Sequence, residues 1–185
     1  MPNFAPMSKS KTILKDERFA LTIDRLCHQL IEQYHDFADT CLVGIQEGGV
    51  LMGDRIHARL LEILGLETLD YGKLDITFYR DDFRTRTKPL KASSTEMDFL
   101  LEGKRVILMD DVLYTGRSVH AAMTALQHYG RPENVELMVM VDRRFNRHLP
   151  IQSDYIGLTI DAFDEAYVRV EWKERDGKDR IRLLG

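Results

Sequence analysis

The sequence has few of the residues that stabilise small or exported proteins covalently. Its 185 residues include two cysteines, Cys27 and Cys41, whose spacing fits neither a zinc site nor a redox motif. Both lie in apolar surroundings, so we expect reduced core residues, which points to the cytoplasm. A chain of this length buries about two-thirds of its unfolded surface, so one domain needs no disulfide or metal for stability.

Long apolar runs and excess positive charge are also missing. No stretch approaches the roughly 18 apolar residues of a membrane-spanning helix, and the N-terminal sequence MPNFAPMSKSK lacks the apolar core of a signal peptide. We therefore expect a protein that is neither secreted nor membrane-embedded. The 26 Lys and Arg are outnumbered by 30 Asp and Glu, for a net charge of −4. This balance disfavours broad nucleic-acid binding, so any RNA contact must depend on a local basic face.

Apolar residues recur with alternating helix and strand periods. We expect residues 1–12 to form a polar tail and residues 13–185 a single domain. The predicted elements are a helix from Asp16 to about His35, a strand at 41–45, a helix at 50–64, strands at 74–79 and 104–110, a helix from about Ser118 to Gly130, and a strand at 135–141. Strands that alternate with helices predict an α/β fold with a mainly parallel central sheet flanked by helices.

Two segments depart from this rhythm. The C-terminal sequence alternates at period two around Asp176 and Gly177, which predicts an antiparallel hairpin. Residues 80–103 are polar and show no sustained period. A loop of that length in a compact domain is usually a lid, a binding loop or disorder. We expect a flexible lid here, with simple disorder as the alternative.

The stretch VILMDDVLYTGRSVHAAM, residues 106–123, carries the strongest chemical signal. A strand that ends at the carboxyl edge of an open α/β sheet delivers its last residues to the ligand-binding edge, so Asp110 and Asp111 are expected on that rim. Residues 115–118 form the turn into the next helix, where free N–H groups and the helix dipole favour a phosphate. Gly116 lets the backbone approach the anion closely. Because the Gly-Lys-Ser/Thr of triphosphate-binding loops is missing, two acids beside a monophosphate cradle predict a sugar phosphate.

Each of these residues also has an ordinary structural interpretation. Acids occur at strand ends near helix N-termini, and Thr and Ser are common helix caps. The ordered combination favours a binding site: a buried strand, two acids, a glycine flanked by hydroxyl residues, and an amphipathic helix.

The same stretch resembles the phosphoribosyl pyrophosphate motif of type I phosphoribosyltransferases. More narrowly, the chain resembles the family of bifunctional pyrimidine-operon attenuators and uracil phosphoribosyltransferases from about residue 14 to residue 183. The blocks that carry the resemblance are ALTIDRLCHQLIE, LDITFYRDD, VILMDDVLYTGRSV, GRPENVELMVMVDR and LPIQSDYIG. It implies the type I phosphoribosyltransferase fold, with a small antiparallel hood, a C-terminal hairpin and a flexible loop over the site.

The resemblance implies that the chain makes UMP and pyrophosphate from uracil and phosphoribosyl pyrophosphate. Mg²⁺ would enter with that substrate, with no protein residue as a direct metal ligand. Asp110 and Asp111 would hold the ribose 2′- and 3′-hydroxyls and would be catalytic together with Arg80. The 5′-phosphate would be bound by Leu113, Tyr114, Thr115, Gly116, Arg117 and Ser118. Purine-using relatives carry an acid at the position of Tyr114, so a tyrosine there favours a pyrimidine.

Other residues are expected around the base and the pyrophosphate. Asp142 and Arg143 end the strand beside the cradle and are placed to line the base site, where Arg143 could stack on a flat base. A surface ion pair is the alternative for these two residues. The resemblance adds Ile160, in the hood region, as a source of main-chain contacts to the base. It also places Arg80 where it could reach pyrophosphate, while residues 81–82 act in the loop or are simply solvated.

One loop departs from the family pattern. After the strand at residues 41–45, family members carry Lys-Thr-Arg-Gly or a near variant, whereas this chain has Gln46, Glu47, Gly48 and Gly49. Each lost cation removes charge-assisted hydrogen bonds worth roughly 1.5–3 kcal/mol. Glu47 could act through Mg²⁺, and the glycine N–H groups could contact an oxygen. We expect phosphoribosyl binding to be retained better than turnover, and Gly48→Arg to raise activity or pyrophosphate affinity.

The RNA-binding positions are altered as well. Arg25 and His28 match basic positions of the family's first helix, although both could be ordinary surface residues, and Asp24 stands where Thr is typical. Lost cations at positions 152 and 158 would weaken RNA binding, while the segment DRRFNRHLP at residues 142–150 remains basic. Two functions stay open. One is a uracil transferase with UMP-dependent regulation through an mRNA leader, and the other is a non-catalytic, nucleotide-sensing attenuator. The resemblance also implies a homodimer or higher homo-oligomer.

Overall fold

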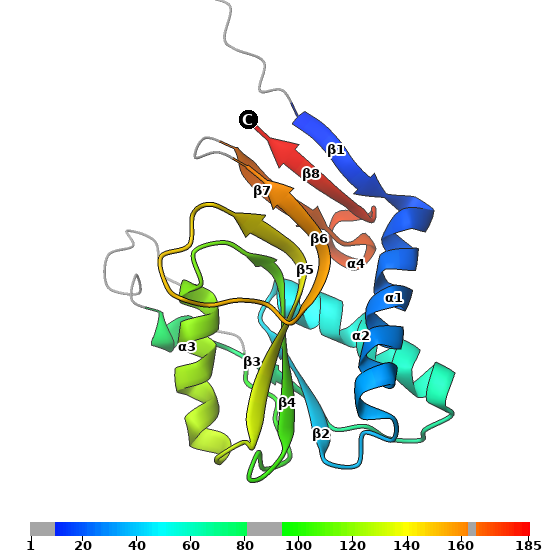
Figure 1. Ribbon diagram of the computed structural model, residues 1–185, viewed down its shortest axis with the longest axis vertical. Helices are drawn as coiled ribbons and strands as arrows, with labels where there is room; N and C mark the ends of the chain where they lie inside the picture. The colour runs from blue at the N-terminus through cyan, green and yellow to red at the C-terminus, as the bar shows by residue number, and fades with distance from the viewer. Residues whose placement is uncertain (1–9, 81–93, 163–165) are drawn as a thin grey trace, which may run out of the picture.

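The computed structural model describes residues 10–80, 94–162 and 166–185. A five-stranded parallel sheet with helices on both faces lies below a smaller three-stranded antiparallel sheet (Figure 1). The elements are β1 (Ser10–Lys15), α1 (Asp16–Tyr34), β2 (Thr40–Ile45), α2 (Gly48–Leu64), β3 (Tyr71–Leu74), η1 (Thr77–Tyr79), β4 (Arg105–Leu113), α3 (Arg117–Leu126), η2 (Gln127–Tyr129), β5 (Asn134–Arg144), β6 (Tyr155–Asp161), β7 (Tyr167–Glu171), α4 (Lys173–Asp176) and β8 (Arg180–Leu184). The predicted α/β class is confirmed.

The central sheet has the strand order β3-β2-β4-β5-β6, with every neighbouring pair parallel. Its middle strands are almost wholly buried, as apolar runs in a parallel sheet predict. Because all strands point the same way, the residues that follow β2, β4 and β5 emerge at one edge. This edge is where the functional residues gather.

Side chains of the central strands alternate between two apolar layers. Leu42, Ile107 and Met138 pack with α1 and α2, whereas Val43 and Leu108 face the opposite layer with α3. Burying a strand on both faces excludes water from its backbone.

The two cysteines behave as the sequence predicts. Cys27 and Cys41 are both free and fully buried. Burial raises the pKa of each thiol to about 12, so both thiols are un-ionised at neutral pH. Within the described ranges, no helix combines the length and apolar character needed to cross a membrane.

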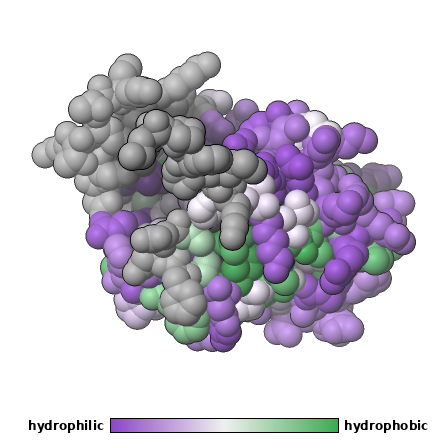
Figure 2. Space-filling view, turned by 90° about the horizontal axis from the view of Figure 1, so that it is seen from above, coloured by the Kyte–Doolittle hydropathy of each residue, from purple (hydrophilic) through white to green (hydrophobic). Residues whose placement is uncertain are grey.

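The smaller sheet, which we call the hood together with α4, has the order β1-β8-β7. The predicted hairpin of β7 and β8 is confirmed, with the single turn of α4 between them. Residues 10–12, expected in the tail, belong to β1, where Ser10 pairs with Leu184. The hood is anchored by Trp172, which is fully buried and meets the Phe19 ring edge-on at 5.1 Å. The face that carries the hood is mostly hydrophilic around a central apolar strip (Figure 2).

The predicted strand at 74–79 is wrong in its position. β3 ends at Leu74, and the chain then turns into η1. The Asp75 carboxylate accepts hydrogen bonds from the Thr77 backbone N–H at 2.8 Å and from its hydroxyl at 2.5 Å. Local side-chain bonds of this kind compete with a sheet ladder. They explain why the apolar pattern does not continue as a strand.

Most of the predicted lid, at residues 81–93, lies outside the described residues. The remainder of segment 80–103 is attached to the sheet. Lys73 and Glu96 exchange two backbone hydrogen bonds of 2.8 and 2.9 Å, and Leu101 is fully buried. Residues 94–103 are therefore not a structureless loop.

Candidate functional site

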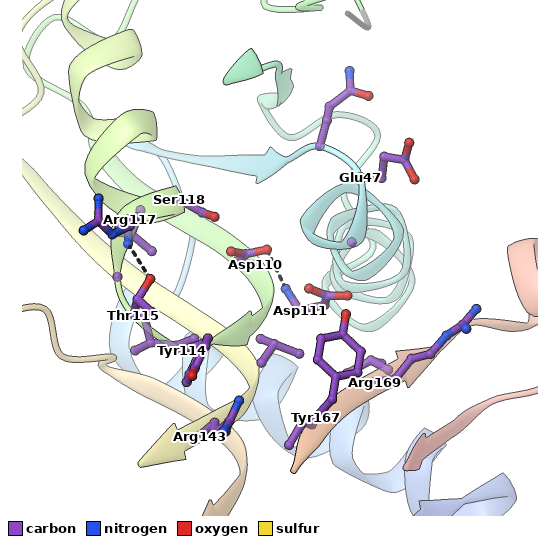
Figure 3. A pocket seen from close by; sticks show the side chains of 18 of the residues that line it. Glu47, Asp110, Asp111, Tyr114, Thr115, Arg117, Ser118, Arg143, Tyr167 and Arg169 are labelled. Atoms are coloured by element: carbon purple, nitrogen blue, oxygen red, sulfur yellow. Dashed lines mark hydrogen bonds between the residues drawn. The ribbon is translucent and has the colours of Figure 1, made fainter. Parts of the chain in front are cut away.

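A pocket of about 790 Å³ lies at the carboxyl edge of the central sheet, beneath the hood (Figure 3). It is lined by the loop after β2, by Arg80, by the end of β4 with the turn that follows, by Arg143 near the end of β5, and by β7 with Arg175 of α4. Most of the predicted site residues therefore meet in one cavity. Gly49, Asp142, Ile160, Arg25 and His28 lie elsewhere.

The paired acids lie within a strand that continues beyond them. β4 runs to Leu113 instead of ending at Asp110, because its pairing with β5 persists as far as Leu113 and Asp142. Asp110 is 8% exposed, and its carboxylate accepts the backbone N–H of Asp111 at 2.9 Å (Figure 3). Both side chains lie in the pocket.

Burial dominates the electrostatics of this pair. It raises the pKa of Asp110 well above its ordinary value, and the neighbouring charge of Asp111 raises it further, while Arg80 opposes the shift. Burial also raises the pKa of Asp111, against the opposing charge of Arg175. Hydrogen-bond donors from a ligand would satisfy both groups, and the vicinal hydroxyls of a ribose are suitable donors.

The turn after β4 has the form of an anion cradle. Gly116 has φ +88° and precedes the first residue of α3, Arg117. The Thr115 hydroxyl accepts the backbone N–H of Arg117 at 3.4 Å (Figure 3). The carbonyl of Thr115 accepts the backbone N–H groups of His148 and Leu149 at 3.0 and 3.2 Å. These two bonds hold the Thr115 carbonyl in place. The backbone N–H groups of Ser118 and Val119, next in the first turn of α3, are available to a phosphate.

Asp142 supports this turn and does not line the base site as predicted. Its carboxylate, in a residue 7% exposed, pairs with Arg147 at 2.6 Å and contacts the Ser153 hydroxyl at 3.4 Å. Arg147, expected as part of a basic surface, also donates to the carbonyl of Tyr114 at 2.5 Å. Sequence reasoning missed this link because Arg147 reaches back through a loop that no local pattern fixes.

Arg143 lines the pocket in a different way from the prediction. Its guanidinium lies 3.9 Å from the centre of the Tyr114 ring, and the residue is 3% exposed. It therefore already stacks on an aromatic ring of the protein. Together, Arg143 and Tyr114 form a flat cationic–aromatic wall (Figure 3).

Ile160 is not part of the hood. It lies in β6, pairs in register with Arg143, and packs in the core. β6 is the edge strand of the central sheet because the outer side of β5 carries backbone donors and acceptors that need partners. The hood is instead built from the two ends of the chain.

The loop after β2 is tightly packed. α2 begins at Gly48, two residues earlier than predicted, and the Gln46 side chain donates to the carbonyl of Ser94 at 2.8 Å. A Cβ atom at Gly48 would stand 2.1 Å from Cγ of Asp111, and one at Gly49 would stand 2.1 Å from the carbonyl oxygen of Met109. The gain expected from Gly48→Arg stays a prediction, and in this geometry the new side chain must displace the Asp111 carboxylate.

The hood contributes pocket residues that sequence reasoning did not identify. Tyr167 and Arg169 project from the exposed face of β7, and Arg175 comes from α4. Period-two alternation places Tyr167 and Arg169 on one face of a strand. Only the docking of the hood shows that this face meets the pocket.

The predicted RNA-contacting residues lie on α1, outside the pocket lining. Arg25 donates to the carbonyls of Ile156 and Gly157 at 3.1 and 2.6 Å, which ties α1 to β6. His28 is exposed. Asp24 is paired with Arg59 at 2.7 Å.

Pocket chemistry fits a metal ion that arrives with a phosphorylated ligand. Across the described parts of the chain, no three His, Cys, Asp or Glu residues are grouped to hold a metal. Glu47, Asp110 and Asp111 nevertheless supply carboxylate oxygens to the pocket. Mg²⁺ commonly binds one or two carboxylates together with substrate phosphates and water.

Comparisons with known proteins agree with this geometry. The family model described as "Phosphoribosyl transferase domain" matches residues 9–175. The chain is 40% identical over 174 residues to the "Bifunctional protein PyrR" of Elusimicrobium minutum, covering 94% of this chain and 96% of that protein. It is 39% identical over 181 residues to the protein of the same name from Bacillus mycoides, covering 96% and 98%.

Solved structures share the fold at low sequence identity. A hypoxanthine phosphoribosyltransferase from Staphylococcus aureus superposes with a TM-score of 0.68 at 20% identity, covering 95% of this chain and 92% of that one. One from Trypanosoma cruzi gives a TM-score of 0.68 at 15% identity, covering 94% and 95%. At these identities the likeness shows the architecture alone.

Proposed function

Because the chain belongs to the phosphoribosyltransferase family, and within it to the bifunctional PyrR proteins, we propose that it is a uracil phosphoribosyltransferase. One observation carries the proposal: the acids Asp110 and Asp111 share a pocket with the turn at residues 115–118 and the N-terminus of α3. A ribose 5-phosphate has a diol at one end and a phosphate at the other. The two halves of the pocket match those two ends.

In the proposed reaction, a ring nitrogen of uracil forms a bond to C1′ of the ribose as the C1′–oxygen bond to pyrophosphate breaks. The electron pair leaves with pyrophosphate, and the proton of the nitrogen is released to solvent water. Asp110 and Asp111 hold the diol and offset the positive charge that develops on the sugar. The turn at residues 115–118 holds the 5′-phosphate. Catalysis then comes from positioning and electrostatic stabilisation, without a covalent intermediate.

Mg²⁺ belongs to the proposal as a partner of phosphoribosyl pyrophosphate. Asp111 and Glu47 are the carboxylates of this chain that would hold it, through oxygen or water contacts. When bound, the ion would neutralise part of the diphosphate charge. Arg80 also lines the pocket, with Nη1 3.4 Å from the Ser118 hydroxyl, and would add positive charge beside that residue.

Uracil as the base rests on the family and on Tyr114. Purine-using relatives carry an acid at this position, and an acid here would lie against Arg143. In this chain the Tyr114 ring instead stacks on the Arg143 guanidinium. A small base could bind beside this wall, with Tyr167 across the pocket (Figure 3). Competition by hypoxanthine or guanine would argue for a purine instead.

The decisive test supplies radiolabelled uracil, phosphoribosyl pyrophosphate and Mg²⁺ and measures labelled UMP. We expect UMP formation by the wild type and its loss in the double variant Asp110→Ala, Asp111→Ala. If the wild type forms no more UMP than that variant, while both stay folded, the enzymatic proposal fails. UMP binding without turnover would leave the non-catalytic sensor as the remaining function.

The name of the curated relatives favours a second, regulatory function. We propose UMP-dependent binding of an mRNA leader, with His28 and the exposed Arg144 and His148 of the segment at 142–150 as contacts. Arg25 is the weaker candidate because its guanidinium is already bound by main-chain carbonyls. Titration with a pyrimidine-operon leader at low salt, with and without UMP, tests this function, and no binding in either condition excludes it. Light scattering on the same sample tests the proposed homodimer or higher homo-oligomer.

A further inference from the structure

The loop after β2 brings no positive charge to the pocket. Gln46 is held by Ser94, Glu47 is acidic, and the space beside Gly48 is filled by the Asp111 carboxylate. A diphosphate leaving group carries several negative charges. Its cations must therefore come from another part of the molecule.

The hood supplies two arginines to the same cavity. Arg169 extends from β7 along the hood side of the pocket (Figure 3), and Arg175 lines it from α4. Among the described residues, five arginines and three carboxylates line the pocket. Without Arg169 and Arg175, three arginines would only balance the three acids. Within this described lining, the excess of positive charge thus comes from the hood.

One acid behind the pocket orients both arginines. Arg169 Nη2 donates to one oxygen of Asp176 at 2.9 Å, and Arg175 Nε donates to the other at 2.9 Å. Arg175 Nη2 also donates to the carbonyl of Val170 at 3.0 Å. Asp176 in turn accepts the backbone N–H of Trp172 at 3.0 Å. Each guanidinium has five N–H donors, so these contacts hold the side chain and leave donors for a ligand.

Arg175 is close enough to Asp111 for its positive charge to affect that carboxyl group. It lowers the pKa of Asp111, against the larger effect of burial. Asp111 lies against Gly48, where the loop after β2 has no side chain. The positive charge of Arg175 is therefore felt beside this glycine.

We propose that Arg169 and Arg175 bind the diphosphate of phosphoribosyl pyrophosphate in place of the cations that the loop after β2 lacks. This inference rests on the proposed transferase function. As the C1′–oxygen bond breaks and its electron pair moves to the diphosphate, the two guanidinium groups donate hydrogen bonds to the developing charge. UMP has no diphosphate, so it does not use these arginines.

The test compares Arg169→Gln, Arg175→Gln and the double variant with Arg182→Gln. Arg182 is a matched control because it is in the same sheet, contacts Glu171 and Ser10, and is not among the residues that line the pocket. Calorimetry measures binding of phosphoribosyl pyrophosphate with Mg²⁺, of inorganic pyrophosphate, and of UMP. We expect affinity for the two diphosphates to fall about tenfold per pocket arginine, UMP affinity to stay within about twofold, and Arg182→Gln to change none of the three. Arg175→Lys should recover part of the loss, because it restores the charge but not the planar donor set.

The outcomes separate the two proposals. Diphosphate affinity that is unchanged in the double variant overturns the role of the hood arginines. A parallel loss of UMP affinity also overturns it, because it shows that the arginines only support the fold of the pocket. If the wild type binds neither UMP nor phosphoribosyl pyrophosphate, the proposed function itself fails, and this inference fails with it.

Discussion

The carboxylate of Asp111 occupies the space that a side chain at Gly48 would need. A Cβ atom at residue 48 would stand 2.1 Å from both Cγ and one oxygen of Asp111. The first residue of α2 and the acid on β4 are therefore fitted to each other. A ligand that contacts Asp111 must also meet the start of α2.

This fit predicts that Gly48→Ala disrupts the pocket. The methyl group must push the Asp111 carboxylate aside, so we expect UMP affinity to fall at least about tenfold, equivalent to a charge-assisted hydrogen bond. Gly65→Ala is the matched control, because Gly65 has φ +63° and open space around its Cβ position. That control should lose stability through backbone strain but keep its UMP affinity. Equal UMP affinity in both variants would show that Asp111 can move without consequence.

The burial of Asp110 predicts a conflict between stability and binding. The pKa of Asp110 is raised in the folded protein. As the pH rises above the ordinary pKa of an aspartate, Asp110 therefore loses its proton in the unfolded state before it does so in the folded state. The free energy of unfolding then falls until the raised pKa is passed. Asp110→Asn removes this effect, so urea unfolding should show a more stable variant at pH 7. The difference in unfolding free energy between the variant and the wild type should shrink as the pH falls toward the ordinary pKa of an aspartate. The UMP affinity of the variant should be about tenfold lower at pH 7.

Asp161→Asn provides the opposite case for the same measurement. Asp161 is exposed, and its pairing with Arg144 lowers its pKa. The Asp161 carboxylate contributes to stability above the ordinary pKa of an aspartate, and this contribution is lost as the pH falls through the lowered pKa of the folded protein. The Asp161→Asn variant should therefore be slightly less stable at pH 7. A less stable Asp110→Asn at pH 7 would contradict the burial argument.

The link from Asp142 through Arg147 to Tyr114 predicts that the phosphate turn depends on one remote arginine. Arg147→Gln should lower the free energy of unfolding by about 1–3 kcal/mol, because it leaves a buried carboxylate without its charged partner. UMP affinity should fall with it. Arg144→Gln removes an exposed pair, with side chains 53% and 50% accessible, and should change stability by less than about 1 kcal/mol. Similar effects of the two substitutions would rule out the supporting role of Arg147.

The stacking of Arg143 on Tyr114 predicts different outcomes for two substitutions at one position. Tyr114→Phe keeps a ring under the guanidinium and should leave stability and UMP affinity almost unchanged. Tyr114→Leu removes the ring and should cost about 0.5–2 kcal/mol, the range of a cation–π contact. Chemical unfolding and calorimetry with UMP measure both quantities. If Phe and Leu behave alike, the ring is not what holds Arg143.

Sequence patterns predicted the order of elements well where the pattern is local. The helix at α1, the buried strands β2, β4 and β5, and the hairpin of β7 and β8 all appear near their expected positions. Errors arose where pairing partners decide the structure. β1 forms because it pairs with β8, which lies at the far end of the chain. β6 forms because it pairs with the free edge of β5.

The same division holds for the pocket. Asp110, Asp111 and the turn at residues 115–118 are adjacent in sequence, so a strand followed by a helix is enough to bring them to one edge. Asp142 could not be placed by such reasoning. Its position after a strand suggested the base site, but Arg147 draws its carboxylate behind the phosphate turn.

The sequence by itself determined the α/β class, the paired acids and the phosphate turn, because these follow from periodicity and from residues close together along the chain. Only the tertiary structure decided that two arginines of the hood line the pocket and that the Asp111 carboxylate fills the space beside Gly48. Arg169 and Arg175 reach the cavity through the docking of the hood, which depends on the packing of Trp172 against Phe19. Asp111 and Gly48 meet through the packing of α2 on β4. Contacts between distant segments have no local signature, so the fold has to be known before they can be seen.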